Sequence, residues 1–234
     1  MMPKEISLLE EKIGYKFKNS ELITTALTHS SYSNELRAKK INISCNERLE
    51  FLGDSVLSII VSKFLYETYP KMPEGQLTKL RASLVCEKAL YSYSKELEIG
   101  DFLFLGKGEE QTGGRTRVSI LADAFEAVLA AMYLDGGIEV ARNHVLRFVR
   151  QELENREEDD FKDYKTSLQE IVQRNPEERL SYVLIAESGP DHDKKFTVEV
   201  HLNSNVIGTG TGKSKKQAEQ NAAKQALNLM GIKE

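Results

Sequence analysis

The sequence has few cysteines and no long apolar run, and both absences narrow the class of protein. Nowhere in its 234 residues is there a run of the ~18–20 apolar residues that a membrane-spanning helix needs. Met1–Glu5 also lack the apolar core of a signal peptide, so we expect a cytoplasmic protein without membrane contact. Cys45 and Cys86 have neither a CxxC partner nor a neighbouring histidine. We therefore expect two free thiols and no zinc site.

The chain as a whole also lacks an excess of positive charge. Its net charge of −4, taken alone, argues weakly against a nucleic-acid-binding protein. The distribution is uneven, because residues 162–234 contain 11 Lys/Arg against 10 Asp/Glu, whereas residues 1–161 contain 21 against 26. The C-terminal part is therefore slightly basic. The N-terminal part has surplus carboxylates, the ligands that hard cations need.

An acidic stretch at residues 151–161 (QELENREEDDF) divides the chain. It cannot bury apolar surface, and we interpret it as the tail of a helix that passes into a linker. The overall apolar content of 40% is enough for a core on either side of it. We therefore predict one domain over residues 1–150 and a second over residues 162–231.

Residues 1–150 have the apolar spacing of helices and should form an all-α domain. Tyr69-Pro70 and Gly136-Gly137 are the expected helix ends. The glycine-rich segment 106–114 should be a flexible loop. The expected helices run from Leu49 to Tyr69, from about Leu77 to Leu97, and from Leu121 to Gly136.

Residues 162–231 change from helical to strand-like periodicity. Three alternating runs are separated by turn residues, and a helical pattern lies on each side of them. The order predicts an α+β domain of the form α-β-β-β-α. Its expected elements are a helix over 164–174, strands over Ser181–Ala186, Lys195–Leu202 and Asn205–Thr211, and a helix over Ser214–Met230.

Carboxylates recur at helical spacing in two of the predicted helices. Glu47, Glu50 and Asp54 stand at i, i+3 and i+7, within about 60° of one another on one face. Asp123 and Glu126 repeat the i, i+3 spacing within an apolar run. Like charges on one face repel, and a bound cation would offset that cost. Two helices with paired carboxylates suit Mg²⁺, although each pair alone is also typical of solvated surface.

Four segments, in order along the chain, resemble the ribonuclease III endonuclease domain. The defining motif is matched by NERLEFLGDSVL at Asn46–Leu57. LTHSSYSNE precedes it, and PEGQLTKLRASLV and SILADAFEAVLAAMYLDGG follow it. The second unit, with KSKKQAEQNAAKQAL at 213–227, resembles a double-stranded RNA-binding domain. The resemblance implies a bacterial-type enzyme with an all-α endonuclease domain followed by an α-β-β-β-α domain.

The resemblance also implies the roles of the acids. Glu50, Asp54, Asp123 and Glu126 match the four metal-site acids of the family. The expected ion is Mg²⁺, with Mn²⁺ as a substitute. Asp54 and Glu126 are the expected catalytic residues, with Glu126 a ligand of the ion that activates water.

The resemblance assigns three more residues near the motif. Glu47 and Glu74 match acids that shape the cleft, and we expect a supporting role for both. Phe51 is large and apolar yet adjoins the acids, so it is either a dimer contact or an ordinary core residue. Endonuclease domains of the family form homodimers, so two acid clusters would face one RNA duplex.

Four further residues have structural interpretations. Asn46 could cap the motif helix with its side chain, and Gly53 suits a close approach of backbone. His29 and His144 are expected to be structural, because the chemistry requires no histidine nucleophile. For His29 we expect a hydrogen bond near the cleft, and direct metal ligation is the minor alternative.

The second unit begins its last helix with clustered lysines. Helix N–H groups and the helix dipole favour phosphate at that end, and these lysines should contact phosphates across the A-form major groove. The resemblance assigns minor-groove contacts to the first helix and to the turn at 189–196, where flanking aspartates weaken phosphate attraction. A solvated lysine run and a surface histidine are the alternatives. The expected RNA-binding residues are Thr166, Gln169, Glu170, His192, Lys213, Ser214, Lys215 and Lys216.

The function that the resemblance implies is Mg²⁺-dependent endonucleolytic cleavage of double-stranded RNA. The products would carry 5′ phosphates and 3′ hydroxyls, with two-nucleotide 3′ overhangs. Expected substrates are ribosomal RNA precursors and some messenger and transfer RNA precursors. Two alternatives remain: a double-stranded RNA-binding protein that does not cleave, and a nuclease that cuts DNA.

Overall fold

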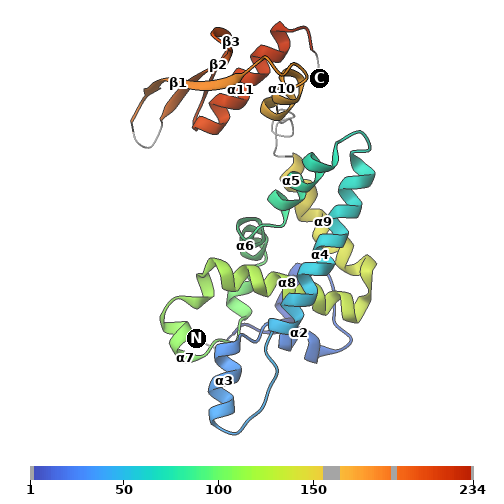
Figure 1. The fold of residues 1–234 in the computed structure, drawn as a ribbon. Helices are drawn as coiled ribbons and strands as arrows, with labels where there is room; N and C mark the ends of the chain where they lie inside the picture. The colour runs from blue at the N-terminus through green and yellow to red at the C-terminus, as the bar shows by residue number, and fades with distance from the viewer. Residues whose placement is uncertain (1–2, 155–163, 191–193, 233–234) are drawn as a thin grey trace. The chain divides into compact units, whose positions relative to one another are not determined.

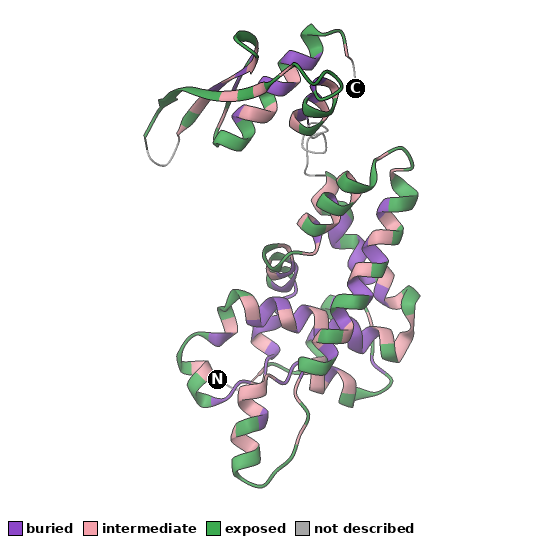
Figure 2. Ribbon diagram, viewed as in Figure 1, coloured by how far each residue is buried: buried purple, intermediate pink, exposed green. Residues whose placement is uncertain are grey.

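The computed structural model describes residues 3–154, 164–190 and 194–232 (Figure 1). The chain divides into two compact units, residues 1–157 and 158–234, and each is described by itself. Buried residues form a separate core in each unit (Figure 2). No helix in these described ranges is long and apolar enough to cross a membrane. Within the same ranges both cysteines are free, as predicted.

The first unit is built around one central helix, α8 (Val118–Gly136). Its sequence is apolar on nearly every face, so it is buried along most of its length (Figure 2). Four helices pack against it: α2 (Ser20–Ala26), α4 (Glu47–Thr68), α6 (Glu87–Glu96) and α9 (Ile138–Glu154). The described part of this unit is helical apart from short connections, which confirms the predicted all-α class.

The two helices that carry the paired acids meet at Gly53. A Cβ atom at this position would lie 2.0 Å from the carbonyl oxygen of Glu126, far inside van der Waals contact. The missing side chain therefore allows α4 and α8 to pack with their backbones in contact. This packing places the first two turns of α4 against the middle of α8.

Both ends of α4 were anticipated, but the predicted cap was wrong. The helix stops at Thr68, and Tyr69 follows it at the expected position. Asn46 occupies the position before the first turn, yet its side chain makes no capping hydrogen bond. Its φ of −77° and ψ of −13° are helical, whereas a capping side chain needs an extended backbone there.

The single helix predicted over residues 77–97 is two helices in the structure. α5 (Glu74–Leu84) ends at Val85, and α6 begins after the extended residue Cys86. Leu84 and Leu90 are both buried, although residues six positions apart on an unbroken helix would point about 120° apart. The break lets both leucines reach the core.

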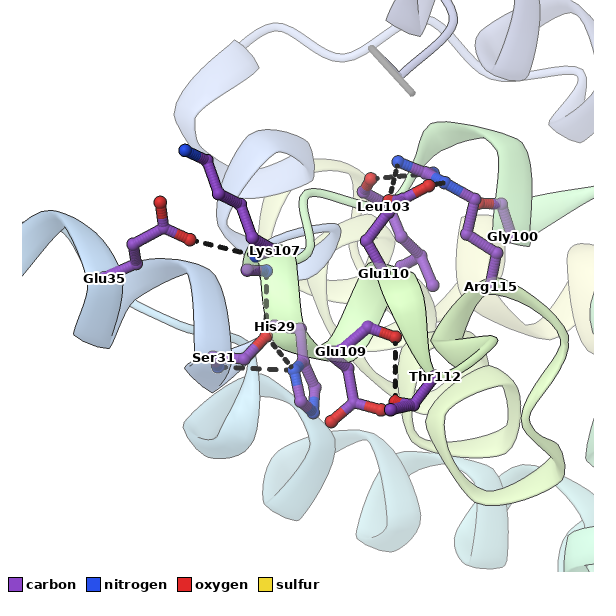
Figure 3. A network of polar contacts seen from close by, with 11 residues as sticks. His29, Ser31, Glu35, Gly100, Leu103, Lys107, Glu109, Glu110, Thr112 and Arg115 are labelled. Carbon is purple, nitrogen blue, oxygen red and sulfur yellow. Dashed lines mark hydrogen bonds and ion pairs between the residues drawn. The ribbon is translucent and has the colours of Figure 1, made fainter.

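The segment at 106–114, predicted to be a flexible loop, contains a short helix. α7 (Lys107–Gln111) is followed by the 3₁₀ turn η2 (Gly114–Thr116). Arg115 holds this region, because its guanidinium pairs with Glu110 at 2.8 Å and donates to two backbone carbonyl oxygens (Figure 3). The remaining short elements are α1 (Ile6–Ile13), α3 (Ser30–Ala38) and η1 (Ile99–Phe102).

The second unit has the predicted α-β-β-β-α order. Its three strands form an antiparallel sheet in the order β1-β2-β3. Two helices cover one face of the sheet and supply the core residues Leu168, Ala222 and Leu227. The elements are α10 (Tyr164–Val172), β1 (Leu180–Ser188), β2 (Lys195–Leu202), β3 (Asn205–Gly212) and α11 (Lys215–Leu229).

Small residues on β3 allow α11 to lie close to the sheet. A Cβ atom on Gly210 would lie 2.1 Å from the backbone nitrogen of Ala222. The alternating glycines of β3 therefore match the alanines on the facing side of α11. This packing fixes the direction of α11 and so the position of its basic N-terminal end within the unit.

Candidate active site and nucleic-acid interface

Three carboxylates lie in the first two turns of α4. Glu47 and Asp54 are exposed and Glu50 is half-buried. Leu49 and Val56 are buried in the core and hold this part of the helix against the domain. The spacing i, i+3 and i+7 thus presents the three acids away from the apolar side of the helix.

The carboxylates of α8 lie close enough to those of α4 to affect their ionisation. Burial, together with the charges of Asp54, Glu50 and Asp123, raises the pKa of Glu126 to about 8. Burial is the largest cause of a raised pKa at Glu50, and the charges of Asp123 and Glu47 raise that pKa further. The structure therefore brings the four acids predicted as metal ligands into one electrostatic cluster.

The chemistry of this cluster suits a hard divalent cation. All four side chains offer carboxylate oxygens, the ligands that Mg²⁺ prefers, and their mutual repulsion would be relieved by a positive ion. In the part of the chain that the structure describes, no three His, Cys, Asp or Glu side chains converge on a common ligand point.

The two acids predicted to support the cleft differ in their surroundings. Glu47 adjoins the cluster, because its charge contributes to raising the pKa of Glu50. Glu74 is the exposed first residue of α5, and its carboxylate accepts a hydrogen bond of 2.7 Å from the Thr78 hydroxyl.

Two further residues act on the cluster through Asp123. Burial raises the pKa of Asp123, the charge of Glu87 raises it further, and the charge of His29 lowers it. Sequence reasoning missed Glu87 entirely. The residue begins α6, and the break between α5 and α6 that places it there depends on core packing, which the local sequence pattern does not reveal.

Phe51 lies on the surface of the chain, which rules out the core alternative. Its side chain is 79% exposed, and two more apolar residues of α4, Ile59 at 60% and Tyr66 at 74%, are exposed as well. Positions i, i+8 and i+15 of a helix lie within about 80° of one another. These three residues form an apolar stripe along α4, hereafter the α4 stripe.

His144 lies in an aromatic cluster and has the structural environment that was expected. It is 4% exposed, and its ring centroid lies 5.4 Å from that of Phe148 and 5.9 Å from that of Phe125. Burial lowers the pKa of His144 to about 3. The imidazole is therefore neutral at physiological pH, and it packs against the side of α8 that carries Phe125.

The basic end of α11 is well ordered by its own caps. The Ser214 hydroxyl accepts the backbone N–H of Gln217 at 3.2 Å, and the Gln217 amide oxygen accepts the N–H of Lys213 at 2.8 Å. This reciprocal arrangement resembles a capping box. Lys215 and Lys216 are exposed in the first turn, next to helix N–H groups that favour an anion.

Three of the other predicted RNA contacts lie on α10. Thr166, Gln169 and Glu170 are all exposed, on the side of α10 away from the buried Leu168. His192 lies outside the described residues. The first helix and the basic helix end are thus accessible within one unit, as a domain that binds an RNA duplex requires.

A helical unit with a carboxylate cluster from two helices, combined with an α-β-β-β-α unit with a basic helix start, is the architecture of a two-domain RNA-binding nuclease. Two families match the chain, one to each unit. The family described as Ribonuclease-III-like matches residues 19–153, and the double-stranded RNA binding motif matches residues 164–230.

Similar proteins cover nearly the whole chain. Ribonuclease 3 of Clostridium tetani is 49% identical over 96% of this chain and 94% of its own. Ribonuclease 3 of Caldanaerobacter subterraneus is 48% identical over 97% of this chain and 99% of its own. The chain belongs to the ribonuclease III family. Its activity is endonucleolytic cleavage of double-stranded RNA.

Solved structures agree for the first unit. The nuclease domain of ribonuclease III from Campylobacter jejuni is 39% identical, with a TM-score of 0.59, over 66% of this chain and 99% of that chain. A second structure of that domain is 40% identical, with a TM-score of 0.58, over 63% of this chain and 97% of that chain. It is described as having structural flexibility in a region involved in dimer formation.

Proposed function

We propose that this chain cleaves double-stranded RNA with Mg²⁺ held by the carboxylates of α4 and α8, and that Mn²⁺ can substitute. The proposed ligands are Glu50, Asp54, Asp123 and Glu126. The observation that carries the proposal is the close packing of α4 on α8 at Gly53, which gathers these acids, and burial together with the neighbouring acids raises the pKa of Glu126 to about 8. A cation bound among these four carboxylates would offset their mutual repulsion.

Each acid has a proposed task. Asp54 and Glu126 are the catalytic pair, because Asp54 is exposed and the charges of the other three acids all act on Glu126. Glu50 and Asp123 complete the ligand set, while Glu47 and Glu74 support the cleft. When bound, the ion lowers the pKa of a water molecule and balances charge on the phosphate. Water attack with loss of the 3′ oxygen gives 5′-phosphate and 3′-hydroxyl ends.

The second unit supplies the RNA contacts. Lys213, Lys215 and Lys216 bind phosphates, and Ser214 orders the turn that presents them. Thr166, Gln169, Glu170 and His192 contact minor grooves, where 2′-hydroxyls distinguish RNA from DNA. The exposed lysines and the capped start of α11 support this assignment.

We infer that two copies of the chain act together. The α4 stripe supports a homodimer centred on Phe51, because an apolar side chain that is 79% exposed is costly in water. Two acid clusters would then cut the two strands, offset to leave two-nucleotide 3′ overhangs. Three further expectations stay predictions. They are the domain bounds of 1–150 and 162–231 with the linker at 151–161, the cytoplasmic location, and the precursor RNAs as substrates.

A gel assay separates this function from its rivals. Duplex RNA and duplex DNA of one sequence are incubated with the protein, with and without Mg²⁺. Shortened RNA only in the presence of Mg²⁺ is the expected result. RNA that shifts in mobility but stays intact would favour the non-cleaving binding protein, and equal cutting of DNA would favour a DNA nuclease.

A further inference from the structure

A pocket of about 490 Å³ lies in the second unit, between one face of α10 and the start of β1. Its volume is within the range of sites that bind small molecules. Val172, Leu180 and Tyr182 give it an apolar lining that adjoins the core of the unit. Apart from Gln169, the residues that line the pocket have no part in the proposed function.

The walls of the pocket are fixed by polar contacts. The backbone N–H of Arg179 donates to Oδ1 of Asn203 at 2.9 Å, and the backbone N–H of Asn203 donates to the carbonyl oxygen of Arg179 at 2.8 Å. On the α10 side, Nζ of Lys165 lies 2.6 Å from the Glu219 carboxylate and 4.5 Å from the centroid of the Tyr182 ring. The pocket is therefore pre-formed, and a ligand would not have to order it.

The polar side chains of the lining suit a nucleotide. Arg179 is exposed, and within the described ranges of the chain no carboxylate pairs with its guanidinium. The charge of Lys165 is already balanced by its ion pair. Gln169 and Gln173 are exposed amides, which both donate and accept hydrogen bonds as the edge of a nucleobase does. Glu178 is the one carboxylate of the lining, so the lining as a whole stays positive.

We propose that this pocket binds a single unpaired nucleotide of the RNA, with its phosphate on Arg179 and the edge of its base on the two glutamine amides. A guanidinium is well suited to phosphate. Bases inside an A-form duplex are stacked, so only a nucleotide from a bulge, a loop or an end could enter. Gln169 belongs both to the pocket and to the face of α10 proposed to contact the minor groove, so the pocket adjoins the bound duplex. The inference rests on that proposed contact.

Two blunt-ended RNA duplexes that differ by one unpaired uridine test the proposal. The affinity of the full chain for each is measured in EDTA, for wild type and for two variants. Arg179→Gln removes the cation of the pocket, and Ser181→Tyr places a ring in it, because Ser181 is an exposed lining residue. Arg174→Gln is the matched control, since Arg174 is exposed just after α10 and does not line the pocket. In a separate sample the uridine is replaced by 4-thiouridine, and its photochemical cross-link is located by mass spectrometry.

The ratio of the two affinities is the decisive quantity. We expect wild type and Arg174→Gln to bind the duplex with the unpaired uridine about 5–100-fold more tightly, the range that one good set of base-edge hydrogen bonds provides. The ratio should fall close to one in both pocket variants, and the cross-link should lie within residues 165–182. A wild-type ratio of one, a ratio unchanged by Ser181→Tyr, or a cross-link elsewhere would overturn the inference and leave the duplex contacts in place. Failure to bind either duplex would overturn the proposed RNA contacts as well.

Discussion

At the scale of single residues, Glu126 carries a large electrostatic cost in the first unit. Burial and three neighbouring carboxylates raise its pKa to about 8, so its ionised form is disfavoured in the metal-free protein. A raised carboxyl pKa contributes stability below its unfolded value near 4.5, and that stability is lost as pH rises toward 8. The position of Glu126 therefore favours cation binding and lowers the stability of the metal-free protein.

Replacement of Glu126 by Gln tests this balance. We expect cleavage of duplex RNA to fall by at least about 100-fold, beyond the usual effect of a residue that only supports a ligand. RNA affinity should be unchanged, and the Tm of the metal-free protein at pH 8 should rise, because the repulsion is removed. Glu11→Gln, on the exposed side of α1, is the matched control. Wild-type turnover in Glu126→Gln would show that the role assigned to it is wrong.

His144 should make the first unit sensitive to acid. Burial lowers the pKa of His144 in the folded chain to about 3, below its ordinary value of 6.5, so the unfolded chain binds a proton that the folded chain excludes. Stability is therefore complete above pH 6.5 and is lost as pH falls toward 3, by up to about 1.4 kcal/mol per pH unit. Urea unfolding of wild type and His144→Phe between pH 7 and pH 4 measures the difference. The same dependence of the unfolding free energy on pH in both proteins would contradict the prediction.

At the scale of elements, the contact of α4 with α8 assembles the cluster. Gly53→Ala should force the helices apart, since the new Cβ would lie 2.0 Å from the Glu126 carbonyl oxygen. We expect a loss of about 1–3 kcal/mol of stability and a larger loss of cleavage, measured by urea unfolding and turnover. Gly75→Ala is the control, because a Cβ there meets nothing within 4 Å and alanine favours the helix of α5. Equal losses of stability and cleavage in Gly53→Ala and Gly75→Ala would contradict this role of Gly53.

The start of α11 should provide part of the salt dependence of RNA binding. Replacing Lys215 and Lys216 with Ala should weaken binding and flatten the plot of log affinity against log salt by roughly one unit per lost phosphate contact. Lys224→Ala is the control on the same helix, since its Nζ lies 5.5 Å from the Tyr164 ring centroid. An unchanged slope in the double variant would mean that these lysines are only solvated.

Local sequence patterns predicted the elements that have long, uniform periodicity. The ends of α4 and α8 were marked by Tyr69-Pro70 and by glycines, and the strand order of the second unit followed from its turns. The break at Cys86, the helix α7 and the missing cap at Asn46 were not predicted. Each of these depends on contacts between residues far apart in sequence, such as Leu84 and Leu90 with the core or Arg115 with the carbonyl of Gly100. The i, i+3 spacing of the acids suggested an Mg²⁺ site shared by the two helices, and the likeness to a known family assigned its four ligands.

At the scale of the whole molecule, one chain supplies one acid cluster and one RNA-binding unit. A duplex has two strands, so an enzyme that cuts both at one place needs a second cluster. The α4 stripe, with Phe51 at 79% exposure, is the surface that would join two copies. We therefore predict that the paired cut requires two copies of the chain, whereas the chemistry at each strand requires the acids of one chain.

The most direct test is to determine the chemical nature of the ends that the protein makes from a defined RNA hairpin labelled on both arms of its stem. With Mg²⁺ present, the account predicts 5′-phosphate and 3′-hydroxyl ends, cuts on both strands two nucleotides apart, and no cleavage by Glu126→Gln. These ends follow from attack by water held at the acid cluster. Cyclic 2′,3′-phosphate ends, or cleavage that persists without a divalent ion, would show that the carboxylates of α4 and α8 do not hold a catalytic metal.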